Sequence, residues 1–188
     1  MDLSQGGTAN CYIVQTPGQY KFDASVRGNS VESVGNPASA EVVWQFTDPE
    51  NANADLINAV NLNGNFVEFV VADNATYGNA LIAVKDASGT ILWSWHIWIC
   101  DFDPELTSHI YKGGNVVMDR NLGATTLNTG SRSERNRATG TFYQWGRKDP
   151  MAVGVVTSTN YLYSLEESYA NPTVFGANTN YNKWISFG

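Results

Sequence analysis

The sequence predicts a mainly β chain made of two modules that join near residue 104. Up to residue 100, short runs of apolar and aromatic residues alternate with turns rich in Gly, Asn, Pro and Ser. The aromatic run Trp93–Cys100 is then stopped by an acidic turn that contains Pro104. The charge balance changes at the same point, since residues 1–105 hold 3 Lys and Arg against 13 Asp and Glu, and residues 106–188 hold 8 against 5.

Composition restricts the class of protein. With 188 residues, 43% of them hydrophobic and 15% charged, the chain is globular and long enough for one large or two small domains. A net charge of −7 disfavours nucleic-acid binding. The chain shows no signal sequence and no apolar run of the ~18 residues that cross a bilayer. Because it stops on an aromatic run at Gly188, we expect a fragment.

The first module (residues 1–104) is expected to consist of strands and turns. Three segments alternate or carry β-forming residues, and loops rich in Gly, Asn, Ser and Pro follow two of them. The expected strands are Asn10–Val14, Gln19–Val26 and Glu41–Thr47, and the expected loops are Arg27–Ser39 and Asp48–Asp55.

Two hairpins complete this module. Leu56–Val71 is expected to fold back at Asn63-Gly64, a strong hairpin turn signal, although a short helix at Ala54–Val60 competes. The second hairpin joins Ala80–Lys85 to Thr90–Cys100 through a four-residue turn. About seven strands with turns every 8–12 residues predict an immunoglobulin-like β-sandwich.

The last strand of the module is apolar on both faces, which predicts a central, buried position. His96, which follows Trp95 and lies two residues before Trp98, is interpreted as a hydrogen-bonded structural histidine. Cys11 and Cys100 are interpreted as two buried thiols, and a disulfide between them remains the alternative.

The acidic residues at the junction raise the question of a metal. Asp101, Asp103 and Glu105 alternate in a way that could supply oxygens to calcium. They lack the glycine and the distal glutamate of an EF-hand loop, so we expect solvated charges and no cofactor, with calcium as the weaker alternative.

The second module (residues 105–188) has less periodicity. We expect a strand at Asn115–Asp119, a loop at Asn121–Thr139 and a strand or helical turn at Thr141–Trp145. The loop carries a basic cluster of Arg132, Arg135 and Arg137. From Lys148 onward the chain is a long stretch rich in Asn, Tyr, Ser and Thr, and loops of this length are usually functional or disordered.

Two motifs in this module carry a family resemblance. Val117–Ala124 (VMDRNLGA) and Phe142–Arg147 (FYQWGR) resemble the Fibrobacter succinogenes major paralogous domain family. Upstream, Thr8–Val14, Gly78–Asp86 and Trp93–Trp98 resemble the β-sandwich that often precedes this domain in surface proteins of gut Bacteroidetes.

The resemblance implies a loop-rich α+β module related to the C-type-lectin-like and formylglycine-generating-enzyme fold. It also implies an extracellular or cell-surface location, in adhesins, fimbrial tips or phage-related binding proteins. A later Asn-Pro-Cys-Pro stretch, expected from the family, is missing here. We therefore expect the second module to be incomplete in this chain, or completed by another chain.

The residues of the two motifs are expected to be structural, forming a charged network, flexible turns and core packing. These residues are Asp119, Arg120, Asn121, Gly123, Tyr143, Trp145 and Gly146. Ligand contact is expected instead from aromatic residues of the long stretch, because aromatic faces stack on sugar rings. These residues are Tyr161, Tyr163, Tyr169, Tyr181 and Trp184.

The function predicted from these observations is a non-catalytic surface module that binds a glycan or a protein receptor. Formylglycine-type chemistry needs a close pair of metal-binding cysteines, and Cys11 and Cys100 both lie outside the second module. The alternative is a structural subunit of a pilus, fibre or phage particle that associates with itself.

Overall fold

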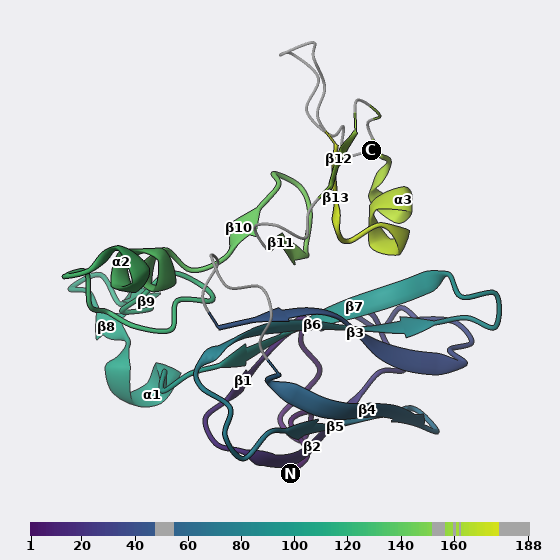
Figure 1. The fold of residues 1–188 in the computed structure, drawn as a ribbon, viewed down its shortest axis with the longest axis horizontal. Helices are drawn as coiled ribbons and strands as arrows, with labels where there is room; N and C mark the ends of the chain where they lie inside the picture. The colour runs from purple at the N-terminus through teal and green to yellow at the C-terminus, as the bar shows by residue number, and fades with distance from the viewer. Residues whose placement is uncertain (48–54, 152–156, 160, 162, 177–188) are drawn as a thin grey trace.

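The computed structural model describes residues 1–47, 55–151, 157–159, 161 and 163–176, and it is mainly β (Figure 1). Seven strands form two sheets. The larger sheet has the order β1-β7-β6-β3 and the smaller the order β2-β5-β4. All neighbours are antiparallel except β1 and β7, which are parallel. The strands are β1 (Cys11–Val14), β2 (Gly18–Asp23), β3 (Ser39–Phe46), β4 (Ile57–Asn63), β5 (Phe66–Val71), β6 (Gly78–Lys85) and β7 (Ile91–Ile99).

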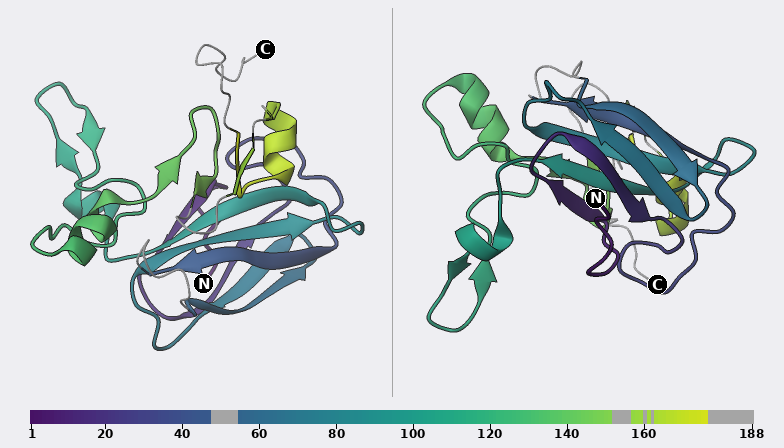
Figure 2. Two further views of the ribbon diagram at one scale, coloured as in Figure 1. Left: turned by 45° about the horizontal axis from the view of Figure 1, so that its top comes forward. Right: turned by 90° about the horizontal axis from the view of Figure 1, so that it is seen from below.

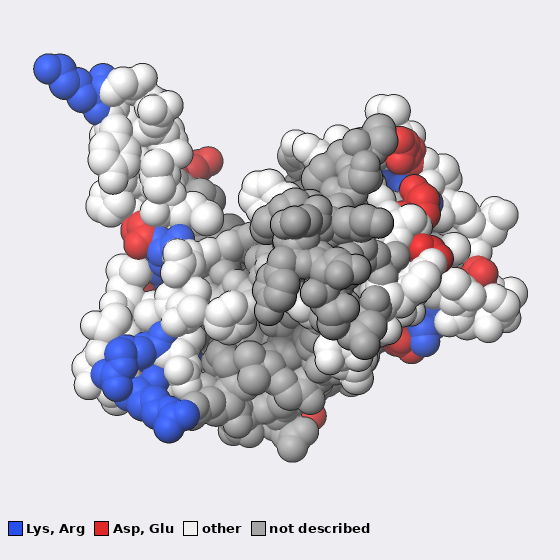
Figure 3. All heavy atoms as spheres, turned by 90° about the horizontal axis from the view of Figure 1, so that it is seen from above, with Lys and Arg blue, Asp and Glu red and all other residues white. Residues whose placement is uncertain are grey.

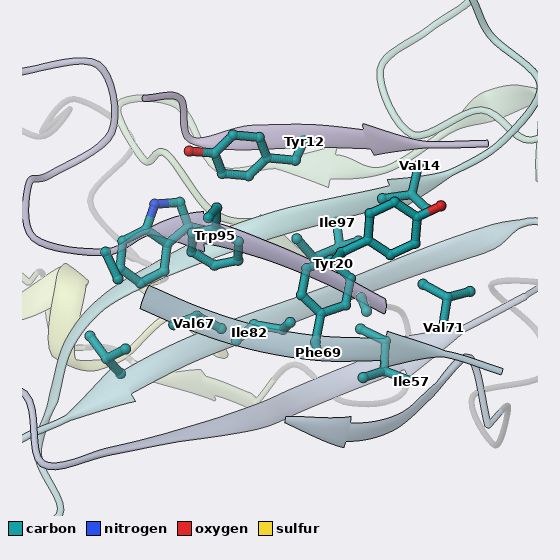
Figure 4. Packing of buried hydrophobic residues seen from close by; sticks show 14 of the residues in the cluster. Tyr12, Val14, Tyr20, Ile57, Val67, Phe69, Val71, Ile82, Trp95 and Ile97 are labelled. Carbon is teal, nitrogen blue, oxygen red and sulfur yellow. The ribbon is translucent and has the colours of Figure 1, made fainter. Parts of the chain in front are cut away.

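The two sheets pack face to face around an aromatic core (Figure 4). Alternate residues of each strand point inward, as the period-two pattern predicts. Phe22 of β2 lies 5.0 Å from Trp95 of β7, measured between ring centroids, and Phe69 of β5 lies 6.2 Å from Phe22. Each of these buried side chains stabilises the fold by about 2–3 kcal/mol relative to leaving it in water.

Both predicted hairpins are confirmed. Asn63 pairs with Phe66, and Gly64 takes the first central position of the turn with φ +58°, a conformation that glycine adopts at no steric cost. The competing helix is wrong for the residues described, because Ile57–Val60 lies in β4, where pairing with β5 satisfies its backbone.

Strand β7 is central, between β1 and β6, as its two apolar faces predict. Trp95 and Ile97 point into the core between the sheets. Ser94, His96 and Trp98 point to the other side, and they are buried as well. Residues from the second half of the chain cover that side (Figure 1).

The chain beyond residue 103 forms short elements, some over this outer side and some beyond one end of the larger sheet (Figure 2). Its described residues contain three two-stranded sheets, β8–β9, β10–β11 and β12–β13, of which the last is parallel. The elements are α1 (Pro104–Thr107), β8 (His109–Ile110), β9 (Val116–Val117), α2 (Arg132–Thr139), β10 (Phe142–Tyr143), β11 (Pro150–Met151), β12 (Thr157–Thr159), α3 (Leu165–Ala170) and β13 (Val174–Gly176).

Some expectations for this part are corrected. The end of the predicted loop Asn121–Thr139 is helix α2, which begins at a capping box formed by Ser131 and Glu134. Of the two alternatives for Thr141–Trp145, the strand is confirmed at β10. The stretch after Lys148 contains a further capped helix, α3, where it is described. Among the described residues no helix is long and apolar enough to cross a membrane.

Candidate ligand-binding surface

The outer face of β7 anchors the second half of the chain. The Ser94 hydroxyl donates to Asp149 Oδ1 at 2.6 Å and accepts from Lys148 Nζ at 2.7 Å. Lys148 also pairs with Asp149, and Trp98 Nε1 donates to the carbonyl of Ala124 at 3.2 Å. Apart from the pair of neighbours Lys148 and Asp149, these contacts join residues that are 26 to 55 positions apart in the chain. They fix residues 124 and 148–149 against a rigid sheet.

His96 belongs to the same anchor. Asn79 Nδ2 donates to the carbonyl of Gly123 at 2.9 Å, so its Oδ1 faces the ring and accepts from His96 Nε2 at 2.8 Å. The other ring nitrogen, Nδ1, lies 3.3 Å from Cys11 Sγ and accepts from the thiol. Burial lowers the pKa of His96 to about 3. The ring is therefore neutral and hydrogen-bonded, as expected of a structural histidine.

Cys11, His96 and Asn79 have the order of a thiol nucleophile, its base and an orienting amide. Their environment opposes that chemistry. Burial raises the pKa of Cys11 to about 12 and that of Cys100 to about 11, so neither thiol ionises readily. Both cysteines are free, in agreement with the buried-thiol interpretation and not with the disulfide. We interpret the three residues as a structural hydrogen-bond network that links β1, β6 and β7.

Ser94 and Lys148 resemble a serine–lysine pair in the same limited sense. Ser94 is only 1% exposed, so substrate has no access to its hydroxyl. Burial lowers the pKa of Lys148, while Asp149 opposes this by favouring the ammonium form. Lys148 Nζ also lies 4.3 Å from the centroid of the Trp93 ring, an arrangement that stabilises a cation. Hydrogen bonds from Lys148 to the hydroxyl and carbonyl of Ser94 thus join the two halves of the chain.

The first family motif forms a second charged contact. Arg120 donates through Nε to Asp119 Oδ1 at 2.8 Å and through Nη1 to Asp101 Oδ1 at 2.6 Å. Its guanidinium lies over the ring of Phe102, and Arg120 lowers the pKa of Asp119. Asn121 Nδ2 donates to the carbonyl of Thr139 at 3.2 Å. The motif thus ties β9 and α2 to the end of the larger sheet.

The acidic residues at the junction have separate partners. Asp101 pairs with Arg120, and Asp103 caps α1 by accepting from the backbone NH of Glu105 at 2.9 Å. In the described ranges, no three His, Cys, Asp or Glu side chains lie close enough together to hold a metal ion.

Gly123 is required by this packing. Its φ is +80°, and a Cβ there would lie 2.6 Å from Cγ2 of Thr141. Thr141 N donates to the carbonyl of Leu122 at 3.0 Å, so the residue before the second motif lies against the first motif. Gly146, with φ +81°, turns the chain after Trp145.

Arg147 organises the segment that carries the predicted ligand residues. Its guanidinium donates to the carbonyl of Ser168 at 3.0 Å and to the carbonyls of Asn171 and Val174. These oxygens lie at the end of α3 and the start of β13, where a cation interacts favourably with the helix carbonyls. The sequence did not predict this role, although Arg147 ends the second motif.

The Tyr169 side chain packs against neighbouring side chains and does not lie on an open surface. Its ring centroid lies 4.5 Å from that of Trp93, and Arg27 lies over both rings. Arg27 also pairs with Glu166 of α3 at 3.1 Å. Tyr169 therefore holds α3 against β7, and only its partly exposed edge is free for a ligand.

The side-chain amide of Gln144 both donates to and accepts from the backbone of Gly176, and so joins the second motif to β13. Its Nε2 donates to the Gly176 carbonyl at 2.8 Å, and Gly176 N donates to its Oε1 at 3.2 Å. Trp145 follows Gln144, and Phe175 precedes Gly176. The backbone carbonyl of Tyr161 also lies here, 3.1 Å from where a Cβ on Gly176 would be.

Four aromatic residues lie on the segments that meet here: Trp145, Tyr161, Tyr163 and Phe175, named here the aromatic cluster. Trp145 is 70% exposed and Tyr161 54%. Tyr163 meets Tyr161 edge-on, with ring centroids 5.1 Å apart, and the Tyr161 hydroxyl donates to Glu167 at 2.9 Å. The expectation that Trp145 fills a core is wrong, because its side chain is largely exposed, whereas Tyr143 is more than half covered and burial raises the pKa of its hydroxyl. Tyr181 and Trp184 lie outside the described residues.

Exposure of aromatic residues differs between the two halves of the described chain. Among the described residues, Tyr77 is the only exposed aromatic up to residue 103, whereas six exposed aromatic residues are described from residue 105 onward. The six are Tyr111, Phe142, Tyr143, Trp145, Tyr161 and Phe175. Aromatic side chains that a stable sheet holds in water are typical of binding surfaces.

Comparison of the chain with protein-family models, curated proteins and solved structures gave no match. Function is therefore inferred from the geometry and chemistry of this surface.

Proposed function

We propose that the chain is a non-catalytic binding module of a cell surface, and that the aromatic cluster contacts the ligand. The observation that carries this proposal is the contrast between the two halves. The first half hides nearly all its aromatic rings in a core, and the second half, held on that core by contacts such as Lys148 with Ser94 and Trp98 with Ala124, exposes several of its own.

A glycan is the ligand class that suits the cluster best. Rings such as Trp145 stack on the apolar faces of sugars, and neighbouring polar groups such as Glu167 accept hydrogen bonds from hydroxyls. The same groups would serve a protein receptor, which is the second outcome of the test below.

The fold is consistent with the family resemblance. The packing of a four-stranded sheet on a three-stranded sheet, with β1 and β7 paired in parallel, agrees with an immunoglobulin-like sandwich. The bond from Thr141, the residue before the second motif, to Leu122 of the first motif brings the two segments close, as expected of parts of one domain. We propose on this basis that residues 105–188 are the first part of a C-type-lectin-like major paralogous domain, following an immunoglobulin-like module.

The test is binding of the purified chain to a broad glycan array, first with calcium and then with chelator. Trp145→Ala and Tyr161→Ala should each weaken binding about tenfold, the loss of one aromatic stacking contact. Tyr77→Ala is the matched control, since Tyr77 is exposed on the first half.

Equal loss in the Tyr77→Ala variant, or none in either cluster variant, would refute the assignment of the site. Absence of glycan binding together with cluster-dependent binding to a cell-surface protein would identify a receptor-binding module. Loss with chelator would show that calcium takes part, and would place carboxylates such as Asp101 among candidate ligands.

A second candidate function is a structural subunit of a fibre or particle. One observation favours it, the exposed apolar hairpin β8–β9, which projects from the rest of the molecule (Figure 2).

A further inference from the structure

The hairpin β8–β9 is the most exposed apolar element of the described chain. All four of its strand residues are exposed, with Ile110 at 76% and Val116 at 63%. Leu106, in the helix before it, is 82% exposed. Seen from above, the hairpin is a largely uncharged projection (Figure 3). The exposed apolar residues in and beside it are Leu106, Ile110, Tyr111, Val116, Val117, Met118 and Leu127.

Such a hairpin gains little stability by itself. Its strands have two residues each, and each pairs only with the other among the described residues. Isolated two-stranded hairpins are marginal in water, and an apolar strand with an open edge pairs readily with another strand. The larger sheet buries its apolar strands, so the exposure of this hairpin is exceptional within the molecule.

We propose that this hairpin is a self-association surface whose occupant is the same hairpin of a second copy. Antiparallel pairing of β8 with its counterpart about a two-fold axis forms a four-stranded sheet and brings the apolar side chains of both copies together. Two-fold pairing of identical patches is the commonest form of oligomer.

The area of the patch supports a stable pair. Seven exposed apolar side chains from each of two copies present on the order of 1,000 Å² or more, which is about the minimum for a specific interface.

The charges around the hairpin agree with the antiparallel direction. Lys112 lies in the turn between β8 and β9, and Glu105 lies at the base of the hairpin, four residues before His109. Both side chains are exposed. Antiparallel pairing brings the Lys112 of each copy toward the Glu105 of the other, whereas parallel pairing would bring like charges together.

This inference is independent of the proposed ligand, because none of the hairpin residues belongs to the aromatic cluster. Pairing through the hairpin leaves both clusters free, so a dimer would present two of them and bind a multivalent surface with higher avidity.

The test is sedimentation equilibrium of the full chain from about 1 to about 300 μM, a range that brackets weak and moderate dimers. We expect a monomer–dimer equilibrium. Ile110→Lys should raise the dissociation constant at least tenfold, and Val31→Lys, a matched change at a 96% exposed valine, should leave it unchanged. Near-ultraviolet circular dichroism of the buried tryptophans checks that each variant is folded.

Charge reversal tests the arrangement separately. Lys112→Glu and Glu105→Lys should each weaken the dimer, and the double variant should restore it. A monomer throughout the range would refute the proposal. So would a dimer that Ile110→Lys leaves intact, or single reversals that the double variant does not rescue.

Discussion

Because the ring of His96 is neutral and buried, we predict that the free energy of unfolding decreases at acidic pH. Burial lowers its pKa from the ordinary value of 6.5 to about 3 in the folded chain. Between those two values the unfolded chain binds a proton at this residue and the folded chain does not. Stability must therefore fall as the pH is lowered through this window, and must be independent of this group above about pH 7.

The magnitude follows from the two pKa values. From pH 7.5 to pH 5 the loss attributable to His96 is about 2 kcal/mol, because the unfolded imidazole gains about 1.4 kcal/mol per pH unit below its pKa. At pH 5 the folded ring is still neutral, so this value depends on the unfolded pKa and hardly on the folded one. The carboxylates whose pKa is lowered, such as Asp119, contribute mainly at lower pH.

The assay is urea unfolding followed by tryptophan fluorescence, at intervals between pH 5 and pH 7.5. His96→Gln should be less stable throughout, since it replaces a fully buried ring, but its stability should lack the 2 kcal/mol slope. His109→Gln, at an exposed position on β8, should keep that slope. A wild-type curve that is flat over this range, or an equal slope in the His96→Gln protein, would refute the reasoning.

Three further predictions follow from the anchoring contacts. Arg147→Ala should lower the free energy of unfolding by about 2–3 kcal/mol and speed amide exchange in α3, because the carbonyls of Ser168, Asn171 and Val174 lose their bonds to the buried guanidinium. Unchanged exchange would contradict the assignment of these bonds as the contacts that hold α3. Lys148→Met should lower the free energy of unfolding by about 3–5 kcal/mol, because it leaves Asp149 buried without its cation. In a double-mutant cycle, adding Asp149→Leu should recover part of that loss. Simple additivity of the two changes would show that the residues are not coupled. Gly123→Ala should lower the melting temperature more than Gly64→Ala does, since both glycines have positive φ but only the Cβ at position 123 would meet a neighbour, Thr141. Equal decreases would mean that the contact with Thr141 relaxes freely.

The larger part of the fold was predictable because its signals are local. The alternation in β2 and β5 specifies strands with defined faces, since side chains of a strand point to opposite sides whatever the chain does elsewhere. The Asn63-Gly64 turn is equally local. Helix α2 was missed for a related reason. It has no buried residue and hence no apolar period, and its only signal is the capping box of Ser131 and Glu134.

The candidate site was only partly predictable. Tyr161 and Tyr163 belong to the aromatic cluster, as the composition of the long stretch indicates, but Tyr169 packs against Trp93 and holds α3 in place. Trp145 differs in the opposite direction, expected in a core and found in solvent. Whether an aromatic ring is packed or exposed depends on which surface the folded chain brings to it, and the ring's own sequence neighbours carry little information about that.

The sequence by itself determined that β7 would be buried on both faces, because Trp and Ile on one side and Trp, His and Cys on the other leave it no face for water. The tertiary structure alone decided what covers the second face. Lys148 and Asp149 meet Ser94 across 54 and 55 positions of chain, and Gly123 meets Asn79 across 44. Such contacts depend on the path of the whole chain. Polar residues that carry no signal in the sequence therefore hold the candidate binding surface in place once the chain is folded.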